Sequence, residues 1–227
     1  MQSITIFKSK EKKQYKDAEL QNIQTTRTET INNSEENLTF QLFFNEKLDD
    51  YIRCHIRMEE PFSIEGRIGS QEISEVIITS TYEAFLNIND GTFVVLANKK
   101  SAEIIDRQFH QYYNIESEKH IIDLQDIISE STNVKRTQFR SLRIETIHGS
   151  SLSGNNVTGT ELYRTMLDAG ELSTIAVTYP YDGADVSFSI SDSGSIVIFS
   201  SINNEDILKF IKQLLNDMRG KNKVILN

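Results

Sequence analysis

Four histidines and one cysteine are the side chains of this sequence best suited to catalysis or metal binding. A zinc-binding helix places two histidines four residues apart, and zinc-binding loops carry cysteines or histidines at short spacings. Neither pattern occurs here, so we expect no metal, no cofactor and no catalytic residue. Isolated titratable groups are seldom catalytic, and we expect each histidine to lie at the surface. The histidines are His55, His110, His120 and His148.

The single cysteine, Cys54, lies in a segment where apolar and polar residues alternate. This period of two over residues 51–59 predicts a half-buried strand. A nucleophilic thiol must be exposed beside a base, whereas this cysteine shares its side of the strand with apolar residues and is expected to be buried. A lone cysteine also cannot form an internal disulfide. The apolar side of the strand carries Ile52, Cys54, Ile56 and Met58.

A polar loop over residues 149–160 is the one segment that could hold an anion. It follows an expected strand and precedes an expected helix, and the N-terminus of a helix attracts anions. The loop lacks the Gly-Lys-Ser/Thr of a phosphate-binding loop and the glycine spacing of a dinucleotide site, and it contains no lysine or arginine. A connector is the favoured interpretation, with a functional loop as the alternative. Its candidate residues are Gly149, Ser150, Ser151, Asn155 and Asn156.

A basic stretch without acidic residues spans positions 135–143 and could contact nucleic acid. Its cations are Lys135, Arg136, Arg140 and Arg143. On a regular strand Arg140 and Arg143 would point to opposite faces, and aromatic residues that could stack on bases are few. Nucleic-acid binding is therefore the alternative function and not the leading one. Further cations near the C-terminus could add a second basic patch: Lys209, Lys212, Arg219, Lys221 and Lys223.

Composition restricts the remaining function classes. The chain has 227 residues, 24 Lys+Arg against 33 Asp+Glu, and a formal charge of −9. An acidic surface repels phosphate backbones at long range. No apolar run approaches the roughly 20 residues that a membrane helix requires, and the N-terminus does not resemble a secretory signal. We expect a cytoplasmic protein without membrane association.

The N-terminal residues 1–37 are poor in apolar side chains. Residues 3–8 alternate and predict a short strand. From residue 8 to 37 the sequence is mostly polar, and the expectation is either a solvated connector or a marginal helix over 11–23. The folded body is expected to begin at Leu38, with strands at 38–44 and 51–59 that continue to residue 68 as a β-meander.

Residues 72–115 and 171–216 resemble one another and predict an internal repeat. Each copy is interpreted as strand, turn, strand, Asp/Gly hairpin, strand and helix. Asp90-Gly91 is a strong hairpin signal because glycine tolerates the positive φ of such turns. Each copy ends in an apolar stripe at helical spacing. The stripes are Ile105, Phe109 and Tyr112 in the first copy, and Ile207, Ile211 and Leu214 in the second.

The segment between the copies predicts a helix at 121–128, a strand at 137–147 and a helix at 161–169 capped by Thr160 or Thr158. The resulting order over residues 137–216 is strand, loop, helix, three strands and helix. This order resembles one half of a TATA-binding-protein-like saddle, in which two such halves form a curved antiparallel sheet backed by helices. The resemblance is topological, no specific motif of that family is present, and the first half has strands where its first helix would stand.

Together these patterns predict an α+β fold, mostly antiparallel sheet, with two βββα units and the helices on one face. We expect a strand and connector over 1–37, a first unit over 38–116 and a second over 117–227, with 38–227 as one composite body. The leading function is a non-enzymatic protein that binds a protein partner or another copy of itself. A complex subunit or immunity-type component fits, because such proteins depend on complementary shape and charge.

Overall fold

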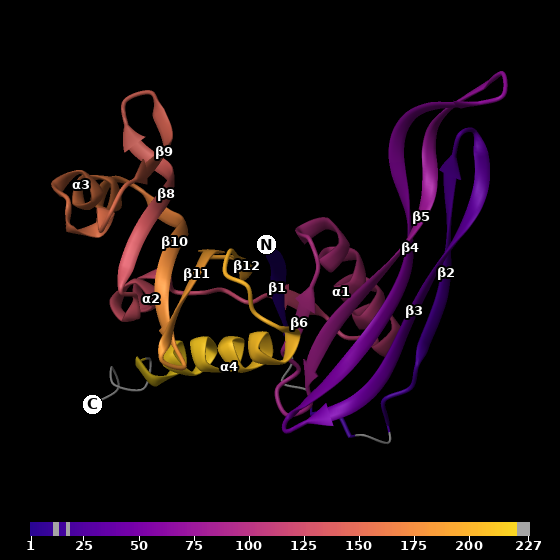
Figure 1. The fold of residues 1–227 in the computed structure, drawn as a ribbon, viewed down its shortest axis with the longest axis horizontal. Coiled ribbons are helices and arrows are strands. Elements are labelled where there is room, and N and C mark those ends of the chain that lie inside the picture. The colour runs from indigo at the N-terminus through magenta and orange to yellow at the C-terminus, as the bar shows by residue number, and fades with distance from the viewer. Residues whose placement is uncertain (11–13, 17–18, 222–227) are drawn as a thin grey trace. The chain divides into compact units, whose positions relative to one another are not determined.

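Antiparallel strands dominate the computed structural model, which describes residues 1–10, 14–16 and 19–221 and is drawn in Figure 1. In the part of the chain that the structure describes, strands account for 55% and helices for 23%, which confirms the expected α+β class. The chain divides into two units, one of Ile6–Glu118 and one of Met1–Thr5 with Lys119–Asn227. Within the described residues, no helix is both long enough and apolar enough to cross a membrane.

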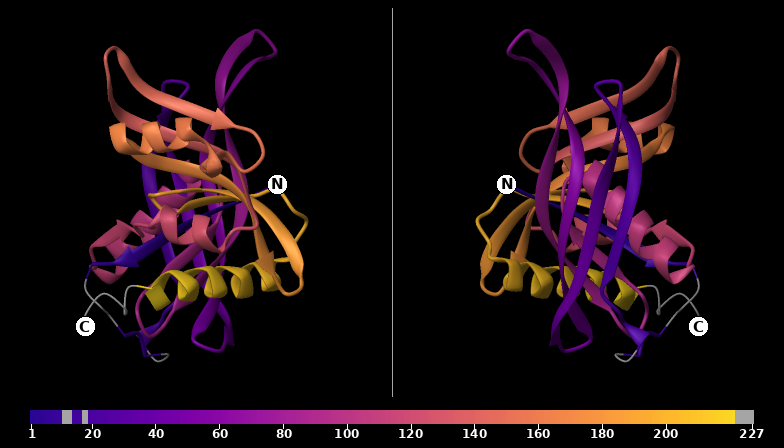
Figure 2. Two further views of the ribbon diagram at one scale, coloured as in Figure 1. Left: turned by 90° about the vertical axis from the view of Figure 1, so that its left-hand side faces the viewer. Right: turned by 90° about the vertical axis from the view of Figure 1, so that its right-hand side faces the viewer.

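The Ile6–Glu118 unit contains an antiparallel sheet in the order β2-β3-β4-β5-β6. The right panel of Figure 2 shows the long strands β2 to β5 side by side. The short strand β7 pairs with β1. The elements are β1 (Gln2–Ser9), β2 (Ile23–Ile31), β3 (Ser34–Leu48), β4 (Tyr51–Ile68), β5 (Gln71–Asn87), β6 (Phe93–Leu96), α1 (Lys99–Tyr113) and β7 (Ser117–Lys119).

The β2–β3 hairpin corrects the expectation of a polar connector through residue 37. Asn32 and Asn33 have φ values of 47° and 66°, and positive φ at both central residues is the conformation that a tight two-residue hairpin requires. The flanking residues alternate threonine with charged side chains and pair from Ile31↔Ser34 to Ile23↔Leu42. The segment is polar because seven of the nine residues of β2 are exposed or half-buried, not because it lacks structure. The alternative of a helix over 11–23 falls partly outside the described residues.

Strand β5 corrects the expected first copy of the repeat. Residues 71–87 form one continuous strand, which pairs with β4 from Ile68↔Gln71 to Tyr51↔Asn87. The interpretation of strand, turn and strand over this segment is therefore wrong, because no glycine, proline or asparagine interrupts its β-branched run before Asn87. The turn lies instead at Gly69, whose φ is 63°.

Helix α1 covers one face of this sheet and closes its core. Asn98 caps the helix by accepting a hydrogen bond from the Ser101 backbone N–H at 3.0 Å. Phe109 is fully buried and its ring stacks on Phe93 at 4.7 Å. The core between helix and sheet includes Phe40, Leu42, Cys54, Ile56, Met58, Ala84, Leu86, Phe93, Ala102, Ile105 and Phe109.

The second unit has the antiparallel order β1-β12-β11-β10-β8-β9, in which β1 contributes residues 2–5. Buried residues on β10 and β8 alternate with polar ones, and α2, α3 and α4 pack on the buried face. Phe210 of α4 contacts the rings of Tyr179, Tyr181 and Phe188. The elements are α2 (Leu124–Glu130), β8 (Asn133–Ile144), β9 (Ile147–Ser153), η2 (Val157–Gly159), α3 (Glu161–Ala169), β10 (Glu171–Tyr181), β11 (Ala184–Ser191), β12 (Ser195–Ile198) and α4 (Asn204–Lys221).

Candidate functional site

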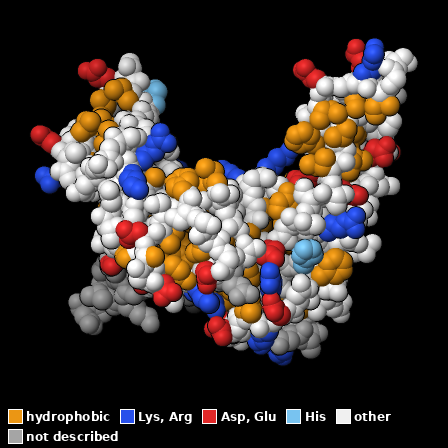
Figure 3. All heavy atoms as spheres, viewed as in Figure 1, with side chains coloured by type: hydrophobic (Ala, Val, Ile, Leu, Met, Phe, Trp, Pro, Cys, Tyr) orange, Lys and Arg blue, Asp and Glu red, His pale blue; other side chains and the backbone are white. Residues whose placement is uncertain are grey.

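The outer half of the β4–β5 hairpin exposes large apolar side chains. Phe62 is 52% exposed, Ile68 69%, Ile77 40% and Ile78 38%. We call these four residues the hairpin patch; Phe62 and Ile78 lie on one face of the hairpin, and Ile77 lies on the other. Figure 3 shows hydrophobic side chains gathered on the outer part of this hairpin, at the upper right. Scattered exposed apolar residues are normal, but a cluster of large ones marks an interaction surface.

The patch is exposed because its neighbours end before it. Strand β3 pairs with β4 from Leu48↔Tyr51 only as far as Phe40↔Met58. The apolar alternation that is buried at Cys54, Ile56 and Met58 continues outward to Phe62, which is exposed. The apolar alternation of β4 therefore continues past the end of β3, where the hydrophobic core no longer covers it.

A buried carboxylate lies at the inner end of the patch. Glu60 pairs across the sheet with Ile78 and is 8% exposed. Its carboxylate accepts hydrogen bonds from the Tyr82 hydroxyl at 2.9 Å and the Ser101 hydroxyl at 3.2 Å. Ser101 belongs to the first turn of α1, where the helix dipole favours negative charge.

No cation lies within ion-pair distance of Glu60 among the described residues. A buried charge is costly unless it is hydrogen-bonded or paired, and two hydroxyl groups and the helix N-terminus hold this one. The patch thus combines exposed apolar side chains with a buried, hydrogen-bonded carboxyl group at its inner end.

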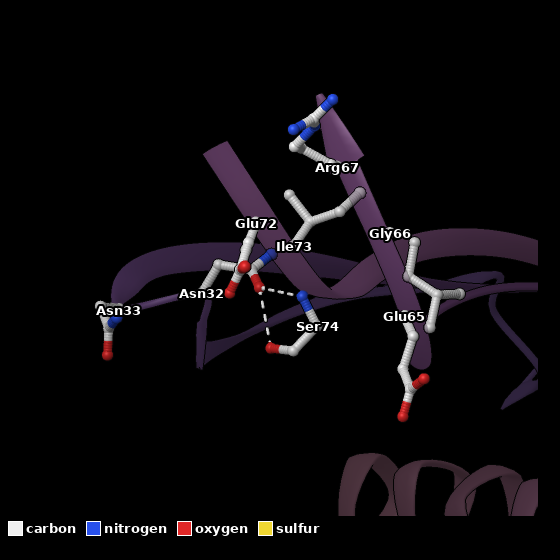
Figure 4. A pocket seen from close by; sticks show the side chains of 9 residues that line it. Asn32, Asn33, Glu65, Gly66, Arg67, Glu72, Ile73 and Ser74 are labelled. Carbon is white, nitrogen blue, oxygen red and sulfur yellow. Dashed lines mark hydrogen bonds between the residues drawn. The ribbon is translucent and has the colours of Figure 1, made fainter. Parts of the chain in front are cut away.

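A second feature of the hairpin is the hollow between its tip and the β2–β3 turn. The Asn32 side chain donates to the Glu75 carbonyl at 2.7 Å and accepts from the Ser74 backbone N–H at 3.1 Å. Figure 4 shows Asn32 directed at Ser74, with Arg67 and Glu65 pointing away from it. The hollow is lined by Asn32, Asn33, Ile64, Glu65, Gly66, Arg67, Glu72, Ile73 and Ser74. Its exposed, mixed charges show none of the converging donors that catalysis needs.

The predicted basic stretch lies on β8, where one of its cations is already neutralised. Arg140 Nε is 3.1 Å from the Glu171 carboxylate, and Nη2 is 2.7 Å from that of Asp192. Its hydrogen bond with Glu171 and the charge of Asp192 raise the pKa of Arg140. Arg136 Nε donates to Ser153 Oγ at 3.3 Å, while Lys135 is exposed.

The expectation that Arg140 and Arg143 point to opposite faces is wrong. Ser141 has a φ of 54°, and the register of β8 against β9 shifts between Arg140 and Ile144. Phe139 and Leu142 are three residues apart, yet both are buried in the same cluster. The same change of phase brings Arg140 and Arg143 to the exposed side together.

The candidate loop at 149–160 is mostly not a loop. Gly149, Ser150 and Ser151 belong to β9 and pair with β8 residues 140, 139 and 138. Asn155 and Asn156 lie in the turn that follows, where the Asn156 backbone N–H donates to Asn133 Oδ1 at 2.9 Å. The next helix, α3, is capped by Thr160 and carries Glu161 in its first turn, an arrangement that disfavours anions.

One histidine is buried, contrary to the expectation that all lie at the surface. His110 is 3% exposed and its Nδ1 is 2.9 Å from Asp106 Oδ1. The Ser117 hydroxyl donates to the other oxygen of Asp106 at 2.6 Å. Because Ser117 contacts the carboxylate and not the imidazole, the three residues lack the nucleophile–base contact of a catalytic triad. Sequence reasoning missed this pair, although an acid four residues before a histidine on one helix is a visible signal.

The expected burial of Cys54 is confirmed, since it is fully buried and burial raises the pKa of its thiol. We expect this thiol to resist Ellman's reagent in the folded protein and to react fully in denaturant, because the reaction requires a thiolate that the reagent can reach. The labelling rate should rise with denaturant in parallel with unfolding followed by circular dichroism. Rapid labelling of the folded chain would contradict this prediction.

Among the described residues, no group of three or more His, Cys, Asp or Glu side chains is arranged to hold a metal ion. The candidate site is therefore a surface: the hairpin patch with Glu60 at its inner end. No family model matches the chain, and no curated protein matches it in sequence.

Proposed function

We propose that this protein is a non-enzymatic binding module that recognises another protein through the hairpin patch, as a complex subunit or immunity-type component. The observation that carries the proposal is that one hairpin exposes four large apolar side chains, each at least 38% exposed, with Phe62 and Ile78 on the same face. Apolar and aromatic side chains framed by polar ones are typical of the centre of protein interfaces.

The alternative, nucleic-acid binding across a curved sheet through Lys135, Arg136, Arg140 and Arg143, has weaker support. The ion pairs of Arg140 with Glu171 and Asp192 would have to be broken before its charge could meet a phosphate. No basic patch accompanies the hairpin patch, where carboxylates outnumber cations. A filter-binding titration at low salt with DNA and RNA tests the alternative, because phosphate contacts make affinity strongly salt-dependent.

A similarity in element order between the two units also bears on the proposed function. The elements β4-β5-β6-α1 and β10-β11-β12-α4 follow one order, with antiparallel strands in each. Both last hairpins carry a glycine with positive φ, 72° at Gly91 and 77° at Gly194. We propose that these are related units of a saddle-like fold, in which the elongated β4–β5 hairpin is the part adapted for binding.

The proposal is tested by capturing partners from native cell extract with three immobilised proteins. The wild type and the control Phe43→Ser are expected to retain the same partner, because Phe43 is 38% exposed on the face of β3 opposite the core. The double variant Phe62→Ser with Ile78→Ser is expected to lose it, since interface anchors carry most binding energy. Equal retention by all three folded proteins would contradict the proposal.

A further inference from the structure

Strand β5 has an unpaired edge along much of its length. It pairs with β4 over Gln71–Asn87 but with β6 only over Glu83–Leu86. In the described part of the Ile6–Glu118 unit, no strand pairs with the other edge of residues 71–82. Ile77 and Ile78 of the hairpin patch belong to this unpaired part of β5.

The direction of the backbone groups follows from the register. The Asn87 backbone N–H donates to Thr92 on the β6 side, and its carbonyl accepts from Gly91. The pairing of β4 with β5 runs without a shift from Tyr51↔Asn87 to Ser63↔Glu75. Because backbone groups alternate along a strand, Ile77, Thr79 and Thr81 direct their N–H and C=O groups to the unpaired edge.

Asn32 already shows how this edge binds an amide. Its side chain donates to the Glu75 carbonyl at 2.7 Å, and its oxygen lies 3.3 Å from the Glu75 backbone N–H. Glu75 is two residues before Ile77 and directs its groups to the same edge. One side chain thus reproduces the pair of hydrogen bonds that one residue of an added strand would make.

The edge lacks the usual protection against such pairing. Natural edge strands carry charged side chains, proline or bulges that block a further strand. Residues 76–82 contain no charge, proline or glycine, and five of the seven are β-branched. Ile77 and Ile78 lie on opposite faces of β5, so an added strand would find an apolar neighbour on each face.

We propose that the β5 edge over residues 76–82 accepts an extended segment of a partner protein as an additional strand. The inference rests on the proposed function and specifies how the partner binds. Main-chain hydrogen bonds would pair the two strands, and side chains on both faces of β5 would contact the partner segment. In the partner segment, apolar side chains would alternate with polar ones, and a basic residue would stand at each end.

The basic ends follow from the charges that frame the edge. Glu75 precedes it, Glu83 follows it with Arg53 as an ion-pair partner, and the buried carboxylate of Glu60 is opposite Ile78. Complementary charge favours encounter and fixes register. A second copy of this chain fits poorly, because antiparallel self-pairing about Thr79 would bring Glu75 of each copy toward Glu83 of the other. The backbone of Glu83 is already paired with Leu96 of β6, so the pairing could not extend past this repulsion.

The test uses the full chain and a fluorescent synthetic peptide of alternating valine and threonine with a lysine at each end. We expect binding by anisotropy that weakens with salt, and about tenfold weaker binding of the same peptide with glutamate ends. An N-methylated version that blocks the pairing amides should not bind. Equal binding of the lysine and glutamate peptides, or binding of the N-methylated peptide, would overturn the proposal.

Variants of the protein provide the second part of the test. Thr79→Pro removes an N–H aimed at the unpaired edge and leaves the ladder with β4 intact, so it should abolish peptide binding while the fold is retained. The control Thr79→Val should bind as the wild type does. If Thr79→Pro dissociates a homodimer in sedimentation, a second copy occupies the edge and the inference is wrong. If the peptides fail but capture still depends on Phe62 and Ile78, the strand-addition mode falls and the proposed function stands.

Discussion

Replacing Phe109 by alanine is expected to lower the free energy of unfolding by about 3–5 kcal/mol. The side chain is fully buried, and its ring lies 4.7 Å from Phe93, 5.1 Å from Tyr113 and 6.1 Å from Tyr15. Alanine would leave a cavity beneath α1 and remove several aromatic contacts at once. Because the chain has no tryptophan, urea unfolding followed by far-ultraviolet circular dichroism is the suitable measurement.

The matched control for this change lies on the same helix. Tyr112 is 44% exposed, and Tyr112→Ala is expected to change the free energy of unfolding by no more than about 0.5 kcal/mol. Similar losses for the two variants would show that α1 does not close the core in the way described. The control also tests a correction, since helical spacing predicts Tyr112 in the buried stripe with Ile105 and Phe109.

Periodicity predicted those parts of the fold that local patterns determine. The alternation around Cys54 gave a strand with the correct buried face, and Ile207, Ile211 and Leu214 are all buried on α4 as expected. The helix at 161–169 has its predicted bounds and its Thr160 cap. In each case the signal is a repeat of apolar residues with one period, which a single sequence displays directly.

Features that depend on distant neighbours could not be predicted in this way. Strand β2 contains more polar than apolar residues, and it is a strand because it pairs with β3 across the Asn32–Asn33 turn. The bulge at Ser141 places Arg143 on the same side of β8 as Arg140, and no residue type in the sequence predicts this bulge. The burial of His110 likewise follows from the packing of α1 and not from its own neighbours in sequence.

The candidate site was missed for a related reason. The residues of the hairpin patch continue the alternation of β4 and β5, so in sequence they are indistinguishable from a half-buried strand. They are exposed because β3 leaves β4 after Met58 and β6 pairs only with the end of β5. Strand pairing sets these limits, and they become visible only in the folded chain.

Gly170→Ala is expected to cost about 1–3 kcal/mol, the range for a side chain forced into a filled space. A Cβ at this position would lie 2.7 Å from Leu142 Cδ2 and 2.8 Å from the Arg140 carbonyl oxygen. The backbone oxygen cannot move without shifting β8, whose Phe139 and Leu142 form a cluster with Tyr163 of α3. Urea unfolding of the purified variant measures the loss.

Gly154→Ala separates this clash from a general effect of alanine. Its added Cβ would meet only Val157 Cγ1 at 3.6 Å, an ordinary contact. Such a change is expected to stabilise by about 0.4–1 kcal/mol, because the unfolded chain loses more freedom than the folded one. A loss of unfolding free energy for Gly170→Ala and a gain for Gly154→Ala would establish that α3 packs against β8 because Gly170 has no side chain. A neutral Gly170→Ala would mean that β8 can yield at Arg140, and that the exposed side of its arginines is less fixed than the ion pairs with Glu171 and Asp192 indicate.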